Sequence, residues 1–331
     1  MNDLDPPTFQ FGRREAPAEI EDDGLEIPNL EPSDPEPADA EAEARAMPAG
    51  GGPVIPGSGR RFRIPFIKSE TGERVVIVIP WIVFAIVIVA VGDLLFTAAL
   101  IGLAALGLRE FFRMTDVYRP LAIPAYAAVA AMLLAAHYGS AFQILMAFAF
   151  AFPVLFAFAA ARDSHRDITA SIAFTLLAVA WIGLGFTHAV LLRDLPLHGG
   201  ALLIDVLVAT FVGDTAAYGA GRLFGSRRIT PRISPNKTLE GLIGGFIGAT
   251  MGFWFAGLYQ DWLPGLDALL MGMVIGLVAP VGDLFASLVK RDLQIKDTGS
   301  LFGVHGGLID RLDAVLFTVV AGYYLSVAFV Y

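Results

Sequence analysis

The chain has 331 residues, of which 56% are hydrophobic and 17% are charged. Soluble domains are typically about 45–50% apolar and about 25% charged, so this composition departs from that of an ordinary soluble protein. The chain has no cysteine, which excludes disulfides, thiolate zinc sites, iron–sulfur clusters and cysteine nucleophiles. The net charge of −9 arises in residues 1–60, which hold 14 acidic and 4 basic residues, whereas the other 271 hold 18 and 19.

Residues 1–68 are predicted to form a disordered, acidic cytoplasmic tail. The first 60 residues contain half of the prolines, two acidic runs and the glycine–proline stretch AGGGPVIPGSG. Such a segment buries too little apolar surface to offset the entropy that it would lose on ordering. A solvating tail is the simplest interpretation, and a docking segment for a partner is the alternative.

Apolar segments follow one another from about residue 75, and they are long enough to cross about 30 Å of hydrocarbon as helices. We count nine, which predicts an all-α, polytopic membrane catalytic domain over residues 69–331. The spans are predicted at 75–92, 94–109, 121–137, 140–161, 168–191, 199–221, 241–259, 266–288 and 313–331. The boundary at Gly92–Asp93 is either a tight turn or the middle of one long tilted helix.

Basic residues predict the orientation of these spans, because they accumulate in short cytoplasmic loops. With a cytoplasmic N-terminus, the inner loops hold 18 of the 19 basic residues after Arg60, and only Arg193 lies outside. Merging the first two spans would reverse every later loop, so the charge distribution favours nine. We therefore predict a multi-pass protein of the cytoplasmic membrane.

The first polar segment at the inner face runs from Gly213 to Gly241. Asp214 is predicted to lie inside the sixth span, where an unpaired carboxylate is costly and therefore indicates function. Tyr218 and Arg222 follow at i+4 and i+8 on the same helix face. The alternative is an Asp–Arg pair that only stabilises the helix bundle.

The end of this segment is typical of a phosphate site. Ser234 or Thr238 is expected to cap the seventh span. Lys237 is predicted to lie in the first turn of that helix, where the helix dipole disfavours a cation. A helix N-terminus with a lysine beside it can bind a phosphate. We interpret the nearby pair Gly244–Gly245 as a contact between packed helices.

The second polar segment runs from Gly282 to Asp313. It begins with a polar stripe on one face of the eighth span: Asp283, Ser287, Lys290 and Arg291. Asp310 and Asp313 share a face where the ninth span begins. Three aspartates that converge in a water-poor region would repel one another unless a cation bound them. Oxygen ligands without thiolates favour Mg²⁺ or Mn²⁺.

Carboxylates for a metal, cations for phosphates and glycine pairs that admit an anion together suit phosphoryl or nucleotidyl transfer. The sequence has no serine-hydrolase elbow, Walker loop or dinucleotide-binding fingerprint. One alternative is a secondary transporter, but a carrier needs polar residues through the midplane, and the outer halves offer little beyond Asp93, Asp205 and His188. Another is a CTP-dependent polyprenol or phytol kinase.

The segment from Ser287 to Asp313, read as S-x-V-K-R, four residues and K-D-x-G-x-x-F-G-x-H-G-G-x-x-D-R-x-D, resembles the signature of the phosphatidate cytidylyltransferases, or CDP-diacylglycerol synthases. The stretches D-T-x-A-Y-x-x-G-R-x-F-G and S-P-x-K-T-x-E-G are also similar to that family. The resemblance covers residues 75–331 and is sharpest over 213–313. One departure is Ala286, where the family often has Glu.

The resemblance implies transfer of CMP from CTP to phosphatidate in the inner leaflet, with release of pyrophosphate, as a step of phospholipid biosynthesis. It implies dependence on Mg²⁺, with Mn²⁺ and a second cation left open, and metal ligation by Asp283, Asp310 and Asp313. The implied catalytic residues are Asp214, Lys237, Lys290, Arg291, Lys296, Asp297, His305 and Arg311. The implied phosphate-binding residues are Arg222, Ser234, Lys237, Thr238, Ser287, Lys290, Gly306 and Gly307.

The expected partners follow from the same resemblance. They are CTP, phosphatidate of the inner leaflet and the surrounding membrane lipids, with a homodimer left open and no nucleic acid expected. The site is expected to face the cytoplasm, because the lipid phosphate lies at headgroup level and CTP arrives from the cytosol. An ionised lipid phosphate needs no strong general base, so we assign none.

Overall fold

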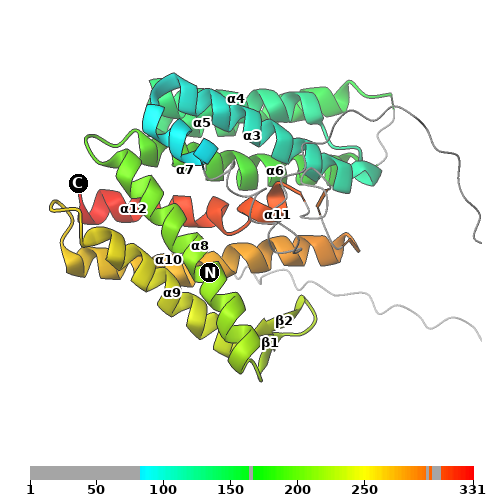
Figure 1. Cartoon of the computed structure of the whole chain (residues 1–331). Helices are drawn as coiled ribbons and strands as arrows, with labels where there is room; N and C mark the ends of the chain where they lie inside the picture. The colour runs from blue at the N-terminus through cyan, green and yellow to red at the C-terminus, as the bar shows by residue number, and fades with distance from the viewer. Residues whose placement is uncertain (1–82, 164–166, 296–297, 300–306) are drawn as a thin grey trace, which may run out of the picture. The chain divides into compact units, whose positions relative to one another are not determined.

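The computed structural model describes residues 83–163, 167–295, 298–299 and 307–331, and most of these are helical (Figure 1). The helices are α3 (Asp93–Met114), α4 (Ala122–Tyr138), α5 (Ala141–Ala160), α6 (Ile168–Ala178), α7 (Leu184–Arg193), α8 (Gly199–Phe224), α9 (Leu239–Gly257), α10 (Gly265–Asp292), α11 (Ile309–Leu312) and α12 (Val315–Phe329). A short 3₁₀ turn, η1 (Asp116–Tyr118), follows α3, and a π-helical turn, η2 (Val179–Gly183), joins α6 to α7.

Seven helical segments within the described residues are long and apolar enough to cross a membrane. This confirms a mostly helical, polytopic membrane protein. Of the other predicted spans, α4 is apolar but has 17 residues. The first span, 75–92, lies partly outside the described residues, since the description begins at 83, and residues 83–91 are helical. The count of nine spans and the tail at 1–68 therefore stay predictions.

The helical conformation is interrupted at Gly92, between the helix of residues 83–91 and α3. Gly92 has a φ of 66° and Asp93 a φ of 52°, both in the left-handed region that L side chains rarely adopt. A side chain at Gly92 would also meet the guanidinium of Arg193, whose Nε donates to the carbonyl of Val89 at 2.6 Å. One continuous helix through this boundary is therefore excluded.

Helices α8, α9 and α10 pack together through small residues. A Cβ at Gly245 of α9 would lie 2.9 Å from Cβ of Ala217 on α8, and a Cβ at Gly213 would lie 3.2 Å from the carbonyl oxygen of Gly245. Without side chains at these glycines, the two backbones approach closely. This confirms that the Gly244–Gly245 pair serves helix packing. It also brings the C-terminal end of α8 and the N-terminal end of α9 beside each other.

An aromatic cluster joins α3, η2 and α10 in the apolar core. The rings of Phe111 and Trp181 meet edge to face with centroids 6.2 Å apart, and Trp181 meets Phe285 in the same way at 4.8 Å. Ala286, next to Phe285, is 1% exposed and belongs to this core. The position where the family that the sequence resembles often has Glu is thus occupied here by an apolar side chain of the core.

The connection between α8 and α9 departs from the all-helical prediction. It folds into an antiparallel hairpin of β1 (Arg228–Thr230) and β2 (Ser234–Thr238), visible beside the end of α8 in Figure 1. Pro231 and Pro235 lack the N–H that a helix needs, which explains the difference. Because α9 begins at Leu239, the prediction that Lys237 lies in the first helical turn is wrong, and it lies in β2.

Candidate active site

A cavity of about 630 Å³ opens where α8, the hairpin, α9, α10 and the start of the C-terminal helices meet. Among the described residues, its charged lining consists of four aspartates, one lysine and one arginine: Asp214, Arg222, Lys237, Asp283, Asp310 and Asp313. These six come from both polar segments of the sequence. The structure therefore brings together the residues that the two segments were predicted to supply.

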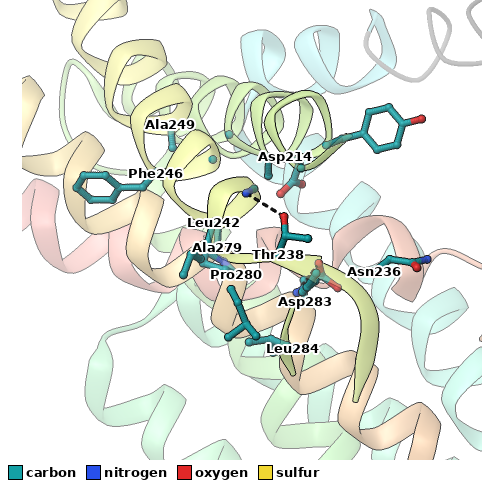
Figure 2. A pocket seen from close by; sticks show the side chains of 18 of the residues that line it. Asp214, Asn236, Thr238, Leu242, Phe246, Ala249, Ala279, Pro280, Asp283 and Leu284 are labelled. Atoms are coloured by element: carbon teal, nitrogen blue, oxygen red, sulfur yellow. Dashed lines mark hydrogen bonds and ion pairs between the residues drawn. The ribbon is translucent and has the colours of Figure 1, made fainter. Parts of the chain in front are cut away.

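The cavity also has an apolar part, lined by small and hydrophobic residues of α9 and α10. Figure 2 shows Leu242, Phe246 and Ala249 to the left of the polar side chains of Asp214 and Asp283. The cavity is therefore polar on one side and apolar on the other. Such a lining suits a ligand that carries both phosphate groups and hydrocarbon.

The three polar residues of α8 that line the cavity share one helix face, as their spacing predicted. They are Asp214, Tyr218 and Arg222. Arg222 Nη1 donates to the hydroxyl of Tyr218 at 2.9 Å, and the charges that act most on Asp214 are those of Asp283 and Lys237. The alternative of an Asp214–Arg222 pair that stabilises the bundle finds no support in the contacts of the described residues.

The hairpin presents Lys237 to the cavity. Its Nζ lies 2.7 Å from Oδ2 of Asp283 on α10, and both side chains keep some exposure, 23% for the lysine and 40% for the aspartate. The next residue, Thr238, caps α9 by accepting a hydrogen bond from the N–H of Gly241 at 3.1 Å. Of the two predicted caps, Thr238 is thus confirmed, and Ser234 lies in β2 opposite Thr230.

Two further contacts hold the hairpin in place. Glu240, in the first turn of α9, accepts hydrogen bonds from the N–H and hydroxyl of Ser226 and from the N–H of Arg227, at 3.1, 2.6 and 3.3 Å. Arg291 donates from Nε to the carbonyl of Ile233 at 3.2 Å. Arg291, predicted to be catalytic, therefore braces the hairpin that carries Lys237.

The polar residues of α10 make contacts both within the helix and with α11. Ser287 lies 3.4 Å from Oδ1 of Asp283, one turn away, and Lys290 forms an ion pair of 2.7 Å with Oδ1 of Asp310 on α11. The side chains of Lys290 and Asp310 are 14% and 13% exposed, so this pair is nearly buried. A buried ion pair needs further hydrogen bonds to offset its desolvation.

Asp310 receives those hydrogen bonds through its other oxygen. Oδ2 accepts from the N–H and the hydroxyl of Thr298, both at 2.9 Å, and from the N–H of Gly307 at 3.1 Å. Together with Lys290, four donors surround this carboxylate. Asp310 therefore links Thr298 and Gly307, which lie before and after the segment 300–306 in the sequence.

Asp313 reaches the cavity because α10 passes very close to the chain before α12. A Cβ at Gly282 would lie 3.0 Å from Cα of Ala314, so only glycine allows this approach. Oδ1 of Asp313 accepts from the N–H of Ala314 at 2.8 Å. Asp313 also interacts electrostatically with Asp283 and Asp214. Three carboxylates thus repel one another across the cavity.

The cavity's donors fit a hard divalent cation by their chemistry, since carboxylate oxygens are the ligands that Mg²⁺ prefers. Its charged lining is also more acidic than basic. In the part of the chain that the structure describes, however, no three carboxylate or histidine side chains are grouped closely enough to hold an ion. The metal set of Asp283, Asp310 and Asp313 therefore stays a prediction.

The remaining predicted residues divide into two groups. Lys296, Asp297, His305 and Gly306 lie outside the described residues. Arg311 is described and lies exposed on α11, while the N–H of Gly307 binds Asp310 rather than facing the cavity.

The sequence analysis missed one carboxylate near this site, Glu110 of α3. It is 6% exposed and binds the backbone at the start of α11. The available signal was an acidic residue between the buried apolar positions Leu108 and Phe111 of a membrane helix. Its partners lie almost 200 residues away in sequence, so helical spacing could not identify them.

Known proteins resemble the chain over part of its length. A phosphatidate cytidylyltransferase of Bacillus subtilis is 33% identical over 159 residues, which cover 48% of this chain and 59% of the relative. One of Mycobacterium leprae is 41% identical over 152 residues, 46% of this chain and 47% of the relative. One of Staphylococcus epidermidis is 29% identical over 228 residues, 66% and 84%.

The chain spans about half the length of the first of these curated relatives. A family model described as "Cytidylyltransferase family" matches residues 72–329, which include every described helix and the whole cavity lining. The match thus extends well beyond the signature segment. The chain belongs to the cytidylyltransferase family.

Proposed function

We propose that this protein is a phosphatidate cytidylyltransferase, which transfers CMP from CTP to phosphatidate and releases pyrophosphate. The observation that carries the proposal is one cavity with an acidic, lysine-bearing side and an apolar side, lined by the motif residues. The charged phosphate groups of the substrates suit the acidic, lysine-bearing side, and the hydrocarbon of phosphatidate suits the apolar side. The names of the similar proteins support the same activity.

In the proposed reaction, a phosphate oxygen of phosphatidate attacks the α-phosphorus of CTP. The bond between this oxygen and the α-phosphorus forms, the bond to the β-phosphate breaks, and pyrophosphate leaves with that electron pair. Lys237 and Arg222 bind phosphate oxygens, since both line the cavity and carry positive charge. No proton must be removed from an ionised phosphate, so the scheme needs no general base.

We further propose that Asp283 and Asp313, with Asp214, hold a divalent cation at the acidic side of the cavity together with the bound triphosphate, since these carboxylates alone are not grouped closely enough to do so. Bound there, Mg²⁺ would neutralise the triphosphate charge and stabilise the leaving pyrophosphate. Asp310, which was also predicted to be a ligand, already accepts from four donors. Its proposed role is therefore to hold Lys290 and the adjoining backbone in place.

The contacts of Asp205 favour an enzyme over a carrier. This aspartate lies on α8, nine residues before Asp214, and both its oxygens accept from Nε2 of Gln260 at 3.1 and 2.9 Å. It is 1% exposed and is not among the residues that line the cavity. A transport path through the midplane would instead need such groups to be open to a channel.

Product analysis tests the activity. Purified protein in detergent is given cytosine-labelled CTP, phosphatidate and Mg²⁺, with and without a chelator. The proposal predicts lipid-extractable label and pyrophosphate in equal amounts, both abolished by the chelator. Labelled CDP with a phosphorylated lipid would instead indicate a kinase, and label that stays in CTP would contradict the proposal.

We also propose nine spans, a cytoplasmic N-terminus and a cytoplasmic active site. Because the chain has no cysteine, single cysteines can report the side of the membrane. Leu197→Cys, which is predicted outside, should react in intact cells with a membrane-impermeant maleimide, and Arg232→Cys, predicted inside, should react only after lysis. The reverse pattern would contradict the orientation.

A further inference from the structure

Glu110 is a buried carboxylate at the end of α3, outside the cavity lining. It is 6% exposed and follows Gly107 and Leu108 on the helix face that packs against the core. A carboxylate in the interior of a membrane protein is costly unless its oxygens are hydrogen-bonded. Its contacts therefore indicate what offsets that cost.

Both oxygens of Glu110 bind the backbone that leads into α11. Oε1 accepts from the N–H of Leu308 at 2.9 Å, and Oε2 accepts from the N–H of Ile309 at 3.0 Å. The first N–H groups of a helix have no partner within the helix and need an external acceptor. A carboxylate offers two acceptor atoms and no donor, so Glu suits this pair of N–H groups better than any neutral side chain.

Glu110 also reaches the other side of the segment 300–306. Oε2 lies 3.5 Å from the hydroxyl of Thr298, whose single proton is shared with the closer Oδ2 of Asp310 at 2.9 Å. A Cβ at Gly299 would lie 3.0 Å from Glu110 Oε1, and one at Gly307 would lie 2.9 Å from its carboxyl carbon. The two glycines thus allow the backbone on both sides to close around this carboxylate.

Two carboxylates therefore bind the same stretches of chain. Asp310 accepts from Thr298 and Gly307, and Glu110 accepts from the two residues that follow Gly307. Asp310 in turn pairs with Lys290 and lines the cavity. Any movement of residues 307–309 would displace Asp310, because it follows them directly.

We propose that Glu110 is a positioning residue of the active site, which holds residues 298–299 and 307–309 so that Asp310 and Lys290 keep their places. The inference rests on the proposed cytidylyl transfer for its kinetic part only. Glu110 touches no substrate in this scheme. It acts through the backbone N–H groups of Leu308 and Ile309.

Glu110→Gln is the direct test, because it keeps the size and puts an NH₂ group against one of the two N–H donors. Loss of one hydrogen bond to a charged group should lower kcat/KM for CTP about tenfold to about a hundredfold. The KM for phosphatidate should not change, because residues of α9 and α10, and none of 298–299 or 307–309, line the apolar side of the cavity. Glu110→Asp keeps both acceptors and should recover part of the loss.

Asp205→Asn is the matched control, because Asp205 is a second buried carboxylate whose hydrogen bonds go to Gln260 and which is not among the residues that line the cavity. Oε1 of Gln260 is buried without a hydrogen-bond partner among the described residues, so it can accept from the new amide. This variant should keep the wild-type kcat/KM. If both variants lowered activity equally, Glu110 would have only a general structural role and the inference would be wrong.

Hydrogen exchange tests the inference without any activity. Amide exchange over residues 307–310 should accelerate at least about tenfold in Glu110→Gln, with the helices elsewhere unchanged. If Glu110→Gln fails to fold, Glu110→Asp is measured in its place and should accelerate exchange over the same residues. Unchanged exchange with unchanged kinetics would overturn the proposal. An inactive wild type would contradict only the proposed function, because the exchange result would still stand.

Discussion

Two lysine–aspartate ion pairs of equal length lie at the cavity in unlike surroundings, one with both partners in the cavity lining and one with only its aspartate there. Lys237–Asp283 and Lys290–Asp310 both measure 2.7 Å, but the first pair is partly exposed and the second nearly buried. Three further hydrogen bonds hold Asp310, whereas Asp283 has the hydroxyl of Ser287 at 3.4 Å. We infer that the first pair opens to bind substrate and the second maintains the architecture.

The difference in exposure between the two pairs follows from the elements on which their residues lie. Lys237 lies on a two-stranded hairpin, which is braced by Glu240 and Arg291 at its edges. Lys290 and Asp310 lie on helices in contact with the core, and Glu110 fixes the backbone beside them. An exposed pair contributes little stability, and breaking a buried pair leaves an uncompensated charge. Substitutions at the two pairs should therefore have different effects.

The largest effect is expected from Asp283→Asn. Loss of this carboxylate removes a proposed metal ligand and the partner of Lys237, so turnover should fall about a thousandfold or more. The protein should remain folded in detergent, because the pair is partly exposed. Labelled product formation and thermal unfolding measure the two quantities. Near-normal turnover would show that Asp283 is not part of the active site.

Lys290→Met should reduce stability. It leaves Asp310 buried without its cation, which should lower the free energy of unfolding by about 3 kcal/mol. Turnover of the folded fraction should also fall, since Asp310 lines the cavity. Thermal unfolding followed by tryptophan fluorescence measures the first effect. A wild-type unfolding temperature would mean that the buried pair is not architectural.

Lys237→Met should instead affect binding. The KM for CTP should rise about tenfold to about a hundredfold through loss of a charged phosphate contact, while the unfolding temperature stays close to that of the wild type. Initial rates over a range of CTP concentrations provide the measurement. If Lys237→Met lowered the unfolding temperature as much as Lys290→Met, both pairs would be structural, and the proposed difference between them would be wrong.

The smallest effect is expected at the cap of α9. Thr238→Ala removes the hydrogen bond to the N–H of Gly241 and should cost about 1 kcal/mol. Thr238→Ser keeps the oxygen and serves as the control. Equal stability of the alanine and serine variants in thermal unfolding would show that the cap contributes nothing.

Helical spacing predicted much of the site. It placed Asp214, Tyr218 and Arg222 on one face of α8, and all three line the cavity. The aspartates of the two polar segments also reach this cavity. In both cases the relevant positions lie within a turn or two of one helix, or on helix ends that the predicted topology puts at the same side of the membrane.

Contacts between distant segments could not be predicted in this way. The partner of Lys237 depends on how the hairpin docks on α10, and Pro231 and Pro235 argue only against helix there and do not specify a hairpin. Glu110 was missed for the same reason, since its partners lie at the far end of the sequence. Periodicity reports one element at a time, whereas these contacts depend on tertiary packing.

A cryo-electron microscopy structure of the protein with CTP and Mg²⁺ would test the contrast between the two pairs most directly. The account predicts the triphosphate beside Lys237 and Asp283, with their 2.7 Å contact lengthened. The Lys290–Asp310 pair should keep its length. A triphosphate bound away from this cavity, or an opened Lys290–Asp310 pair beside an unchanged Lys237–Asp283 pair, would contradict it.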